Sequence, residues 1–212
     1  MRRLSEIGLF FKEFVTNQYT TGAVLPSGRF LAKALARFVA EKPDGPRRVL
    51  EVGPGTGAVT ARIVRVLAPE DRLDMVELNE RFVKMLEGRF ENEEPFRAVA
   101  ERCRVLHCPV EELEGQEPYH LAVSGLPLNN FPAADVEKIL ATITGLLLPG
   151  GTLSFFEYIA MRRMKGLVSG RAERERLGGV GQAMAAVLSD QEIRRDAVWI
   201  NVPPAWVHHV RV

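Results

Sequence analysis

The spacing of apolar residues divides the chain into two parts. In the first 46 residues, apolar positions three or four apart predict two helices. The first covers residues 4–15, and the second begins after Pro26 with Ser27 as its cap. Residues 42–46 contain two prolines and a glycine and predict a connector. We therefore expect an N-terminal helical segment, residues 1–46, ahead of a main domain, residues 47–212.

Strands and helices alternate from residue 48 onward. Short apolar runs predict five strands with helices between them, at residues 49–52, 73–78, 103–107, 121–124 and 151–159. Such alternation is typical of a parallel sheet with helices on both faces. Two more strands are expected around Pro203 and Pro204, at residues 197–202 and 206–211. The pattern predicts an α/β fold whose sheet ends in a C-terminal antiparallel hairpin.

Composition narrows the class of protein only slightly. The 212 residues are 46% apolar and 26% charged, which suits one globular core. A formal net charge of +1 gives no general attraction to nucleic acid. No apolar run reaches the roughly 20 residues that span a bilayer, and charged residues interrupt the N-terminal apolar stretch, so we expect no signal peptide. Cys103 and Cys108 are expected to be reduced thiols, with no metal site.

A glycine-rich turn follows the first predicted strand of the main domain. Gly53, Gly55 and Gly57 would allow a ligand to approach the backbone closely, and the following helix start offers free N–H groups to an anion. Glu77 ends the next strand, where an acidic side chain typically accepts hydrogen bonds from ribose hydroxyls. Glu51, two residues before the first glycine, suits a ligand with an ammonium group. The pattern favours S-adenosylmethionine, which carries all three groups.

Two other interpretations of this turn stay open. Gly53, Gly55 and Ala58 also satisfy a variant of the nicotinamide-binding fingerprint. That fingerprint usually has an apolar residue at the position of Glu51, and the chain offers no clear second nucleotide-binding half. A glycine-rich turn without a ligand is the remaining alternative.

Four segments together resemble a known family. Residues 49–57, Val-Leu-Glu-Val-Gly-Pro-Gly-Thr-Gly, are similar to the first motif of class I methyltransferases, E-x-G-x-G-x-G. With residues 21–27, 124–132 and 203–207, they resemble the bacterial phospholipid N-methyltransferases of the Sinorhizobium type over nearly the whole chain. The resemblance implies a seven-stranded, Rossmann-like sheet with a reversed last hairpin. It also implies stepwise methylation of phosphatidylethanolamine towards phosphatidylcholine.

The resemblance also implies which residues hold the cofactor and the acceptor. The expected cofactor contacts come from Glu51, Gly53, Gly55, Thr56, Gly57, Glu77, Leu78, Val110 and Ser124. Many relatives have an acidic residue after the third strand, where adenine binds, but this chain has Cys108-Pro109-Val110 there. That substitution leaves the Val110 backbone as the expected adenine contact. The acceptor slot is expected to be lined by Gly125, Leu126, Pro127 and Phe131.

Methyl transfer to an amine requires a free lone pair. A head-group ammonium should titrate near the lysine value of about 10.4, so the site must favour the neutral amine. Tyr19 and Asn129 are the candidate catalytic residues, although Tyr19 could equally be a packing residue and Asn129 could simply shape a turn. His208 and His209 alternate along the last predicted strand, so we expect one to face solvent.

A lipid substrate would require contact with a membrane. The first helix could insert Leu4, Ile7, Phe10, Phe11 and Phe14 into the interface of an anionic membrane, or it could pack as a lid. We expect a cytoplasmic protein, peripheral at the inner face of the cytoplasmic membrane, and consider nucleic acid an unlikely partner. Residues 124–132 are also similar to rRNA adenine dimethyltransferases, so an rRNA adenine N6-methyltransferase-like enzyme stays an alternative. A catalytically silent peripheral membrane protein that retains the cofactor pocket is another.

Overall fold

The computed structural model describes most of the main domain. The described residues are 28–42, 44–159, 179–182, 184–185, 188, 191–201 and 203–212. The predicted helix over residues 4–15, with its five membrane-contact residues, and the candidate Tyr19 lie outside them. Within the described residues, no helix is long and apolar enough to cross a bilayer.

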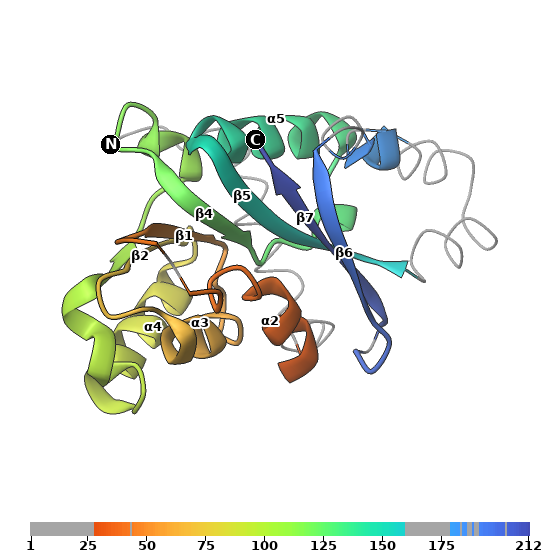
Figure 1. Cartoon of the computed structure of the whole chain (residues 1–212). Coiled ribbons are helices and arrows are strands. Elements are labelled where there is room, and N and C mark those ends of the chain that lie inside the picture. Colours follow the sequence, from red (N-terminus) through yellow and green to blue (C-terminus); the bar gives the residue numbers. More distant parts are fainter. Residues whose placement is uncertain are drawn as a thin grey trace.

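A mixed sheet forms the centre of the molecule (Figure 1). The described part contains seven strands in the order β3-β2-β1-β4-β5-β7-β6. The strands are β1 (Arg48–Val52), β2 (Arg72–Val76), β3 (Cys103–Leu106), β4 (Tyr119–Ser124), β5 (Leu147–Tyr158), β6 (Glu192–Val198) and β7 (Ala205–Arg211). The first five are parallel, and β7 runs antiparallel to both β5 and β6. The predicted α/β fold with its C-terminal antiparallel hairpin is confirmed.

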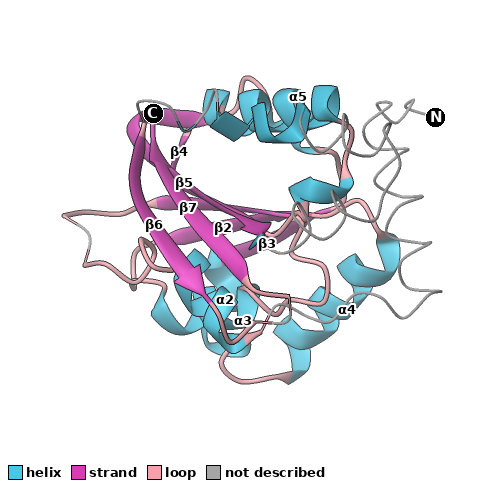
Figure 2. Cartoon of the chain, turned by 90° about the vertical axis from the view of Figure 1, so that its right-hand side faces the viewer, coloured by secondary structure: helices cyan, strands magenta, loops and turns pink. Residues whose placement is uncertain are grey.

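Helices cover both faces of this sheet (Figures 1 and 2). On one face lie α2 (Arg29–Leu35), α3 (Thr60–Val66) and α4 (Glu80–Asn92), and on the other lies α5 (Ala133–Gly145). Short 3-10 turns complete the described part: η1 (Arg97–Arg102), η2 (Val110–Leu113) and η3 (Leu128–Asn130). Each face has its own apolar core, so the sheet is buried on both sides as a parallel sheet requires.

The helix starts show how local sequence sets the element boundaries. Asn79 caps α4, and its side-chain oxygen accepts a hydrogen bond from the Arg81 N–H at 2.9 Å. The cap of α2 is Gly28, which offers no side-chain hydrogen bond, so the prediction that Ser27 caps this helix is wrong. Leu31 and Leu35 are fully buried in the core that contains α3 and the strands, and this packing holds the short α2 helix.

The last hairpin is displaced from its predicted position. Strand β6 covers Glu192–Val198 rather than residues 197–202, and Trp199, Ile200 and Asn201 follow it before β7 begins at Ala205. Charged residues dominate β6 because it is an edge strand whose side chains pair with one another and with β7. Arg195 binds Glu192 at 2.6 Å, for example. The sequence of β6 therefore lacks the alternation of apolar and polar residues by which a strand is predicted.

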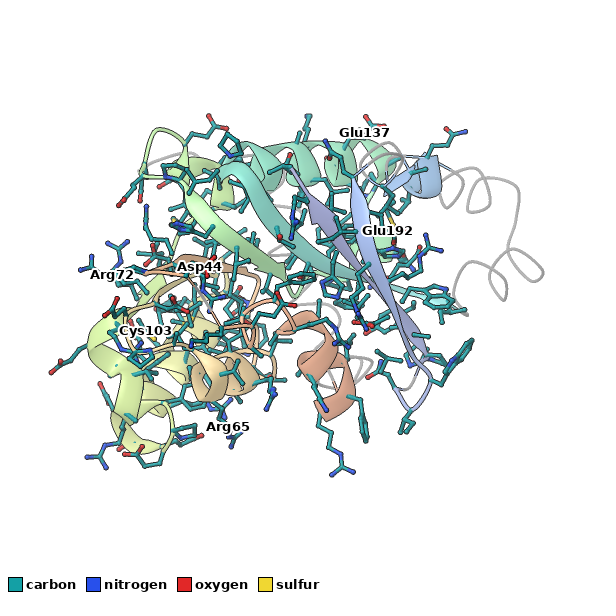
Figure 3. The ribbon with its side chains drawn as sticks, viewed as in Figure 1. Asp44, Arg65, Arg72, Cys103, Glu137 and Glu192 are labelled. Atoms are coloured by element: carbon teal, nitrogen blue, oxygen red, sulfur yellow. The ribbon has the colours of Figure 1, made fainter. Side chains whose placement is uncertain are left out.

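Both histidines of β7 are buried, so the expectation that one faces solvent is wrong. Glu192 lies on β6 (Figure 3), and its Oε1 is 2.6 Å from His208 Nδ1; the His208 ring stacks on Phe155. His209 Nδ1 lies 2.8 Å from the Ser154 hydroxyl on the opposite face of the strand. Burial lowers the pKa of His209 to about 4. Both rings are packed against aromatic side chains: His208 against Phe155, and His209 against Phe38, with ring centres 4.9 Å apart.

Candidate functional site

The glycine turn between β1 and α3 has a backbone that favours glycine at three positions. Gly53, Gly55 and Gly57 have φ values of 68°, 57° and 79°. Gly53 N–H donates to the Val76 carbonyl at 3.0 Å, which ties the turn to the end of β2. A Cβ on Gly57 would lie 2.8 Å from side-chain atoms of Leu86 and Arg89. The turn therefore closes against α4 only because residue 57 has no side chain.

Glu77 holds the turn from the end of β2. Its two carboxylate oxygens accept hydrogen bonds from the backbone N–H groups of Gly55, at 3.0 Å, and Asn79, at 2.9 Å. Burial raises the pKa of Glu77, and the backbone N–H donors oppose that rise. A buried acceptor thus lies beside the turn, at the position where a ribose is expected to bind.

Glu51 has a buried carboxyl group that could bind a cation. It is fully buried in β1, and neither of its oxygens makes a hydrogen bond of normal geometry within the described part of the chain. Burial raises the pKa of Glu51 to about 8, the charge of Glu77 adds to this rise, and Thr60 opposes it. An unpartnered buried carboxyl group is costly, and an ammonium group would supply the missing partner. Glu51 therefore fits the methionine end of S-adenosylmethionine.

An open pocket of about 370 Å³ lies at the carboxyl ends of the central strands. Its lining brings together four of the predicted site residues: Gly53, Leu78, Val110 and Leu126. The other lining residues are Val52, Val76, Cys108, Glu111 and Ile139. The walls are mainly apolar, as suits the flat ring of a nucleobase. The predicted adenine contacts after β2 and β3 thus face the same space.

Two residues that sequence reasoning missed belong to this region. Glu111, directly after Val110, lines the pocket and provides an acidic side chain close to the triplet that lacks one. Arg89 Nη1 donates to the carbonyls of Thr56, at 3.0 Å, and Gly57, at 3.1 Å. Its guanidinium group also lies 4.1 Å from the Phe96 ring centre. Arg89 thereby fastens the glycine turn to α4.

The acceptor loop, residues 124–131, follows β4 and packs against the glycine turn. Gly125 N–H donates to the Val52 carbonyl at 2.9 Å, so the loop continues the pairing of β4 with β1. Ser124 is buried, and its hydroxyl accepts a bond from Leu126 N–H at 3.4 Å. Pro127 is half-buried and precedes η3. The loop therefore has a fixed backbone next to the cofactor turn.

The two remaining predicted residues of this loop have structural partners. Asn129 is buried, and its side-chain amide donates to the Tyr158 carbonyl at the end of β5, at 3.3 Å. Phe131 is fully buried in the core beneath α5 and does not line the pocket. Both residues position the acceptor loop. Among the described residues, no three His, Cys, Asp or Glu side chains gather as metal ligands would.

Comparisons with known proteins agree with this geometry. Residues 49–151 match the family model of a methyltransferase domain. A relative from Singulisphaera acidiphila, an ornithine lipid N-methyltransferase, is 27% identical over 151 residues, which are 71% of this chain and 77% of the relative.

Solved structures share the fold. The O-methyltransferase from Bacillus cereus, in complex with SAH, has a TM-score of 0.64 at 12% identity, over 100% of this chain and 93% of the other. The O-methyltransferase TomG from Streptomyces achromogenes, in complex with SAM, has a TM-score of 0.64 at 13% identity, over 99% and 91%. At these identities the similarity establishes the fold.

The glycine turn, the buried Glu51 and the family match define an S-adenosylmethionine-dependent methyltransferase. Residues 49–151 match the methyltransferase-domain model, and the fold is the one shared with the two solved O-methyltransferases. The cofactor is S-adenosylmethionine, which excludes the nicotinamide alternative. We expect its amino-acid end to bind at Glu51, its ribose at Glu77 and its adenine in the pocket beside Val110.

Proposed function

We propose that this enzyme methylates the primary amine of a membrane lipid head group. Phosphatidylethanolamine is the proposed substrate, methylated stepwise towards phosphatidylcholine. The observation that carries the proposal is the similarity to an ornithine lipid N-methyltransferase over 71% of the chain. Ornithine lipid and phosphatidylethanolamine share the reacting group, an amine on a lipid, and this supports the amine as acceptor.

Methyl transfer requires the acceptor site mainly to align the amine and to surround it with apolar groups. Bound S-adenosylmethionine supplies a methyl group on a good leaving group, so proximity and alignment account for much of the rate. The acceptor amine has to lose its proton to water before it reacts, because an ammonium has no lone pair. Leu126 and Val52 make the nearby wall apolar, and a desolvated amine there has a lowered pKa.

The acceptor loop gives this alignment a physical basis. Gly125 is bound to the end of β1, and Asn129 is bound to the end of β5. These two anchors fix Leu126 and Pro127 between them. A loop fixed at both ends presents the same surface at each turnover, which favours an in-line approach of the amine to the methyl group.

The site of reaction is part of the same proposal. We place the enzyme at the inner face of the cytoplasmic membrane, with the predicted helix of residues 4–15 in the interface. Its support is the sequence pattern, in which five apolar residues share a face and basic residues flank them.

Methyl transfer from labelled S-adenosylmethionine tests the proposal. Vesicles of phosphatidylethanolamine, vesicles of ornithine lipid and unmodified rRNA are offered in parallel to the full chain. We expect label in phosphatidylethanolamine and none in RNA. Label only in ornithine lipid would keep the amino-lipid class and change the head group. Labelled RNA with inert vesicles would overturn the proposal in favour of an adenine methyltransferase.

A further inference from the structure

Exposed apolar side chains gather at one end of the described structure. Across the described residues, five large apolar side chains are exposed: Phe30, Met85, Ile193, Trp199 and Ile200. Met85 lies on α4 and Ile193 near the start of β6, whereas Phe30 on α2 and the pair Trp199 and Ile200 after β6 belong to segments that are hydrogen-bonded to each other. Trp199 and Ile200 are 63% and 72% exposed, and Phe30 is 40% exposed. We call Phe30, Trp199 and Ile200 the hairpin patch; such a group of exposed apolar residues marks an interaction surface.

The hairpin patch has a defined shape. Asn201 Oδ1 accepts a hydrogen bond from Gly28 N–H at 3.1 Å, and Asn201 Nδ2 donates to the Pro203 carbonyl at 2.7 Å. The turn is therefore tied to the start of α2, and the two segments lie side by side in Figures 1 and 2. Trp199 packs edge-to-face on Trp206, with ring centres 5.9 Å apart.

This turn lies on the same edge of the sheet as the cofactor site. The β5–β7 ladder pairs Tyr158 with Ala205, and the β6–β7 ladder pairs Val198 with Ala205. Residues 199–201 therefore project at the carboxyl end of β5, the edge at which the glycine turn and the acceptor loop also lie.

Hydrogen bonds link the acceptor loop to the hairpin turn. Asn129 donates to the Tyr158 carbonyl, and the next residue, Ile159, donates its N–H to the Pro204 carbonyl at 2.9 Å. Two hydrogen bonds, one from the Asn129 side chain and one between backbone groups, thus connect the loop beside the cofactor to the exposed turn. A surface bound to the hairpin patch would thus lie at a fixed position relative to the acceptor site.

Basic residues lie next to the hairpin patch. Residues 28–37 and 199–206 contain no acidic residue; Arg37 pairs with Asp196 of β6 at 2.6 Å, and Arg29 and Lys33 lie on α2. The Arg29 guanidinium lies 4.8 Å from the Phe30 ring centre, so basic and apolar groups are adjacent. Tryptophan beside basic residues is the composition that favours the interface of an anionic bilayer.

A second copy of the chain fits this surface less well. A stable interface between two proteins needs about 800 Å² from each partner. Three side chains, two on a projecting turn and one on the adjacent α2, supply only a small part of that area, whereas a projecting turn can enter between lipid head groups.

We propose that the hairpin patch docks the enzyme onto an anionic phospholipid bilayer, with the acceptor site facing the head groups. The substrate side of this inference rests on the proposed function, but the docking itself does not require turnover. The hairpin patch shares no residue with the predicted helix of residues 4–15.

Tryptophan fluorescence reports directly on the hairpin patch. Trp199 and Trp206 are the only two tryptophans in the sequence. We would titrate the full-length Trp206→Phe variant with vesicles of anionic phospholipid whose acyl chains carry bromine. Insertion of Trp199 should shift its emission to shorter wavelength, and bromine should quench it. Binding to the vesicles without quenching would overturn the proposal.

Matched variants separate docking from general surface effects. Trp199→Ser with Ile200→Ser should weaken vesicle binding about tenfold or more, because interfacial tryptophan and isoleucine are lost. Met85→Ser, which removes an exposed apolar side chain elsewhere, should change it less than about twofold. Equal effects of both would contradict the proposal. An emission shift that depends on protein concentration without vesicles would identify a second copy as the partner and overturn it.

Methyl transfer to detergent-dispersed phosphatidylethanolamine distinguishes this inference from the proposed function. If bromine quenches Trp199 but no dispersed lipid is methylated, docking stands and the proposed substrate is wrong. If dispersed lipid is methylated but Trp199 is not quenched on vesicles, the substrate stands and the docking surface is wrong.

Discussion

Gly125 lies directly against the backbone of Gly53: a Cβ on residue 125 would be 2.6 Å from the Gly53 carbonyl oxygen. The acceptor loop and the cofactor turn therefore meet backbone to backbone. The Gly53 carbonyl and the acceptor loop cannot shift independently, because the Gly125 N–H donates to the Val52 carbonyl and the Gly53 N–H donates to the Val76 carbonyl. This contact therefore sets the distance between the cofactor site and the acceptor site.

Gly125→Ala should push the acceptor loop away from the glycine turn. Because alignment carries much of the rate, we expect kcat to fall about 100-fold, with a smaller effect on cofactor affinity. Steady-state kinetics and calorimetric titration would separate these effects. Gly88→Ala is the matched control, since a Cβ there meets no atom within 4 Å and the residue lies inside α4. It should retain activity and stabilise the fold by about 0.5–1 kcal/mol.

Glu51 should make stability and cofactor binding depend on pH in opposite ways. Its pKa in the folded protein is about 8, against 4.5 as an exposed group, so folding takes up a proton between these values. The free energy of unfolding of the cofactor-free protein should therefore fall as pH rises through this window. Glu51→Gln should flatten part of that slope in denaturation measured from about pH 5 to about pH 9. Glu70→Gln, an exposed carboxylate, should leave the slope unchanged.

The cofactor ammonium needs Glu51 in its ionised form. Below about pH 8, binding should release a proton from Glu51, and affinity should rise as pH approaches that value. Calorimetry in buffers of different ionisation enthalpy would count the proton. Glu51→Gln should bind more weakly and release less of it. Proton release that is identical in the variant would show that Glu51 is not the partner of the ammonium.

Arg89→Lys should loosen the glycine turn while leaving the fold in place. The variant loses the paired bonds to the carbonyls of Thr56 and Gly57, and a net hydrogen bond contributes about 1 kcal/mol, so the Kd for cofactor should rise about fivefold. Arg97→Lys, an exposed arginine on η1, should bind normally. An unchanged Kd in Arg89→Lys would mean that the turn holds its shape without this anchor.

Cofactor binding should protect Cys108 from alkylation. Cys108 lines the pocket, whereas Cys103 lies at the start of β3 (Figure 3). Burial raises the pKa of both thiols, that of Cys103 to about 12, so labelling requires mildly alkaline solution. Peptide mass spectrometry should show Cys108 labelled at least about fivefold more slowly with saturating cofactor, and Cys103 unaffected. Equal protection of both would indicate a general tightening rather than coverage of the pocket.

The sequence predicts the fold correctly wherever a short stretch of consecutive residues determines the element. The parallel strands of the first half are apolar runs, and the glycine turn has three glycines at positions that require positive φ. Strand β6 was misplaced because edge strands with paired charges have no apolar periodicity.

The site was accessible only in part. Glu51 and Glu77 belong to recognisable sequence motifs. Arg89 and Glu111 come to the site through tertiary packing: Arg89 lies 33 residues after Thr56, and Glu111 lies in the turn after β3. The burial of His209 likewise depends on Ser154, which is 55 residues away. No local pattern records such contacts, so they had to come from the structure.

The charged edge strand β6 bears on how this protein avoids self-association. An exposed strand edge is a template for adding further strands, and charged side chains there discourage such growth. Arg194, Arg195 and Glu192 stand along β6. Along β6, exposed Ile193 is flanked by charged residues, whereas Trp199 and Ile200 beyond its end are not. Replacing those charges with threonine should increase association through the edge of β6 before it alters catalysis.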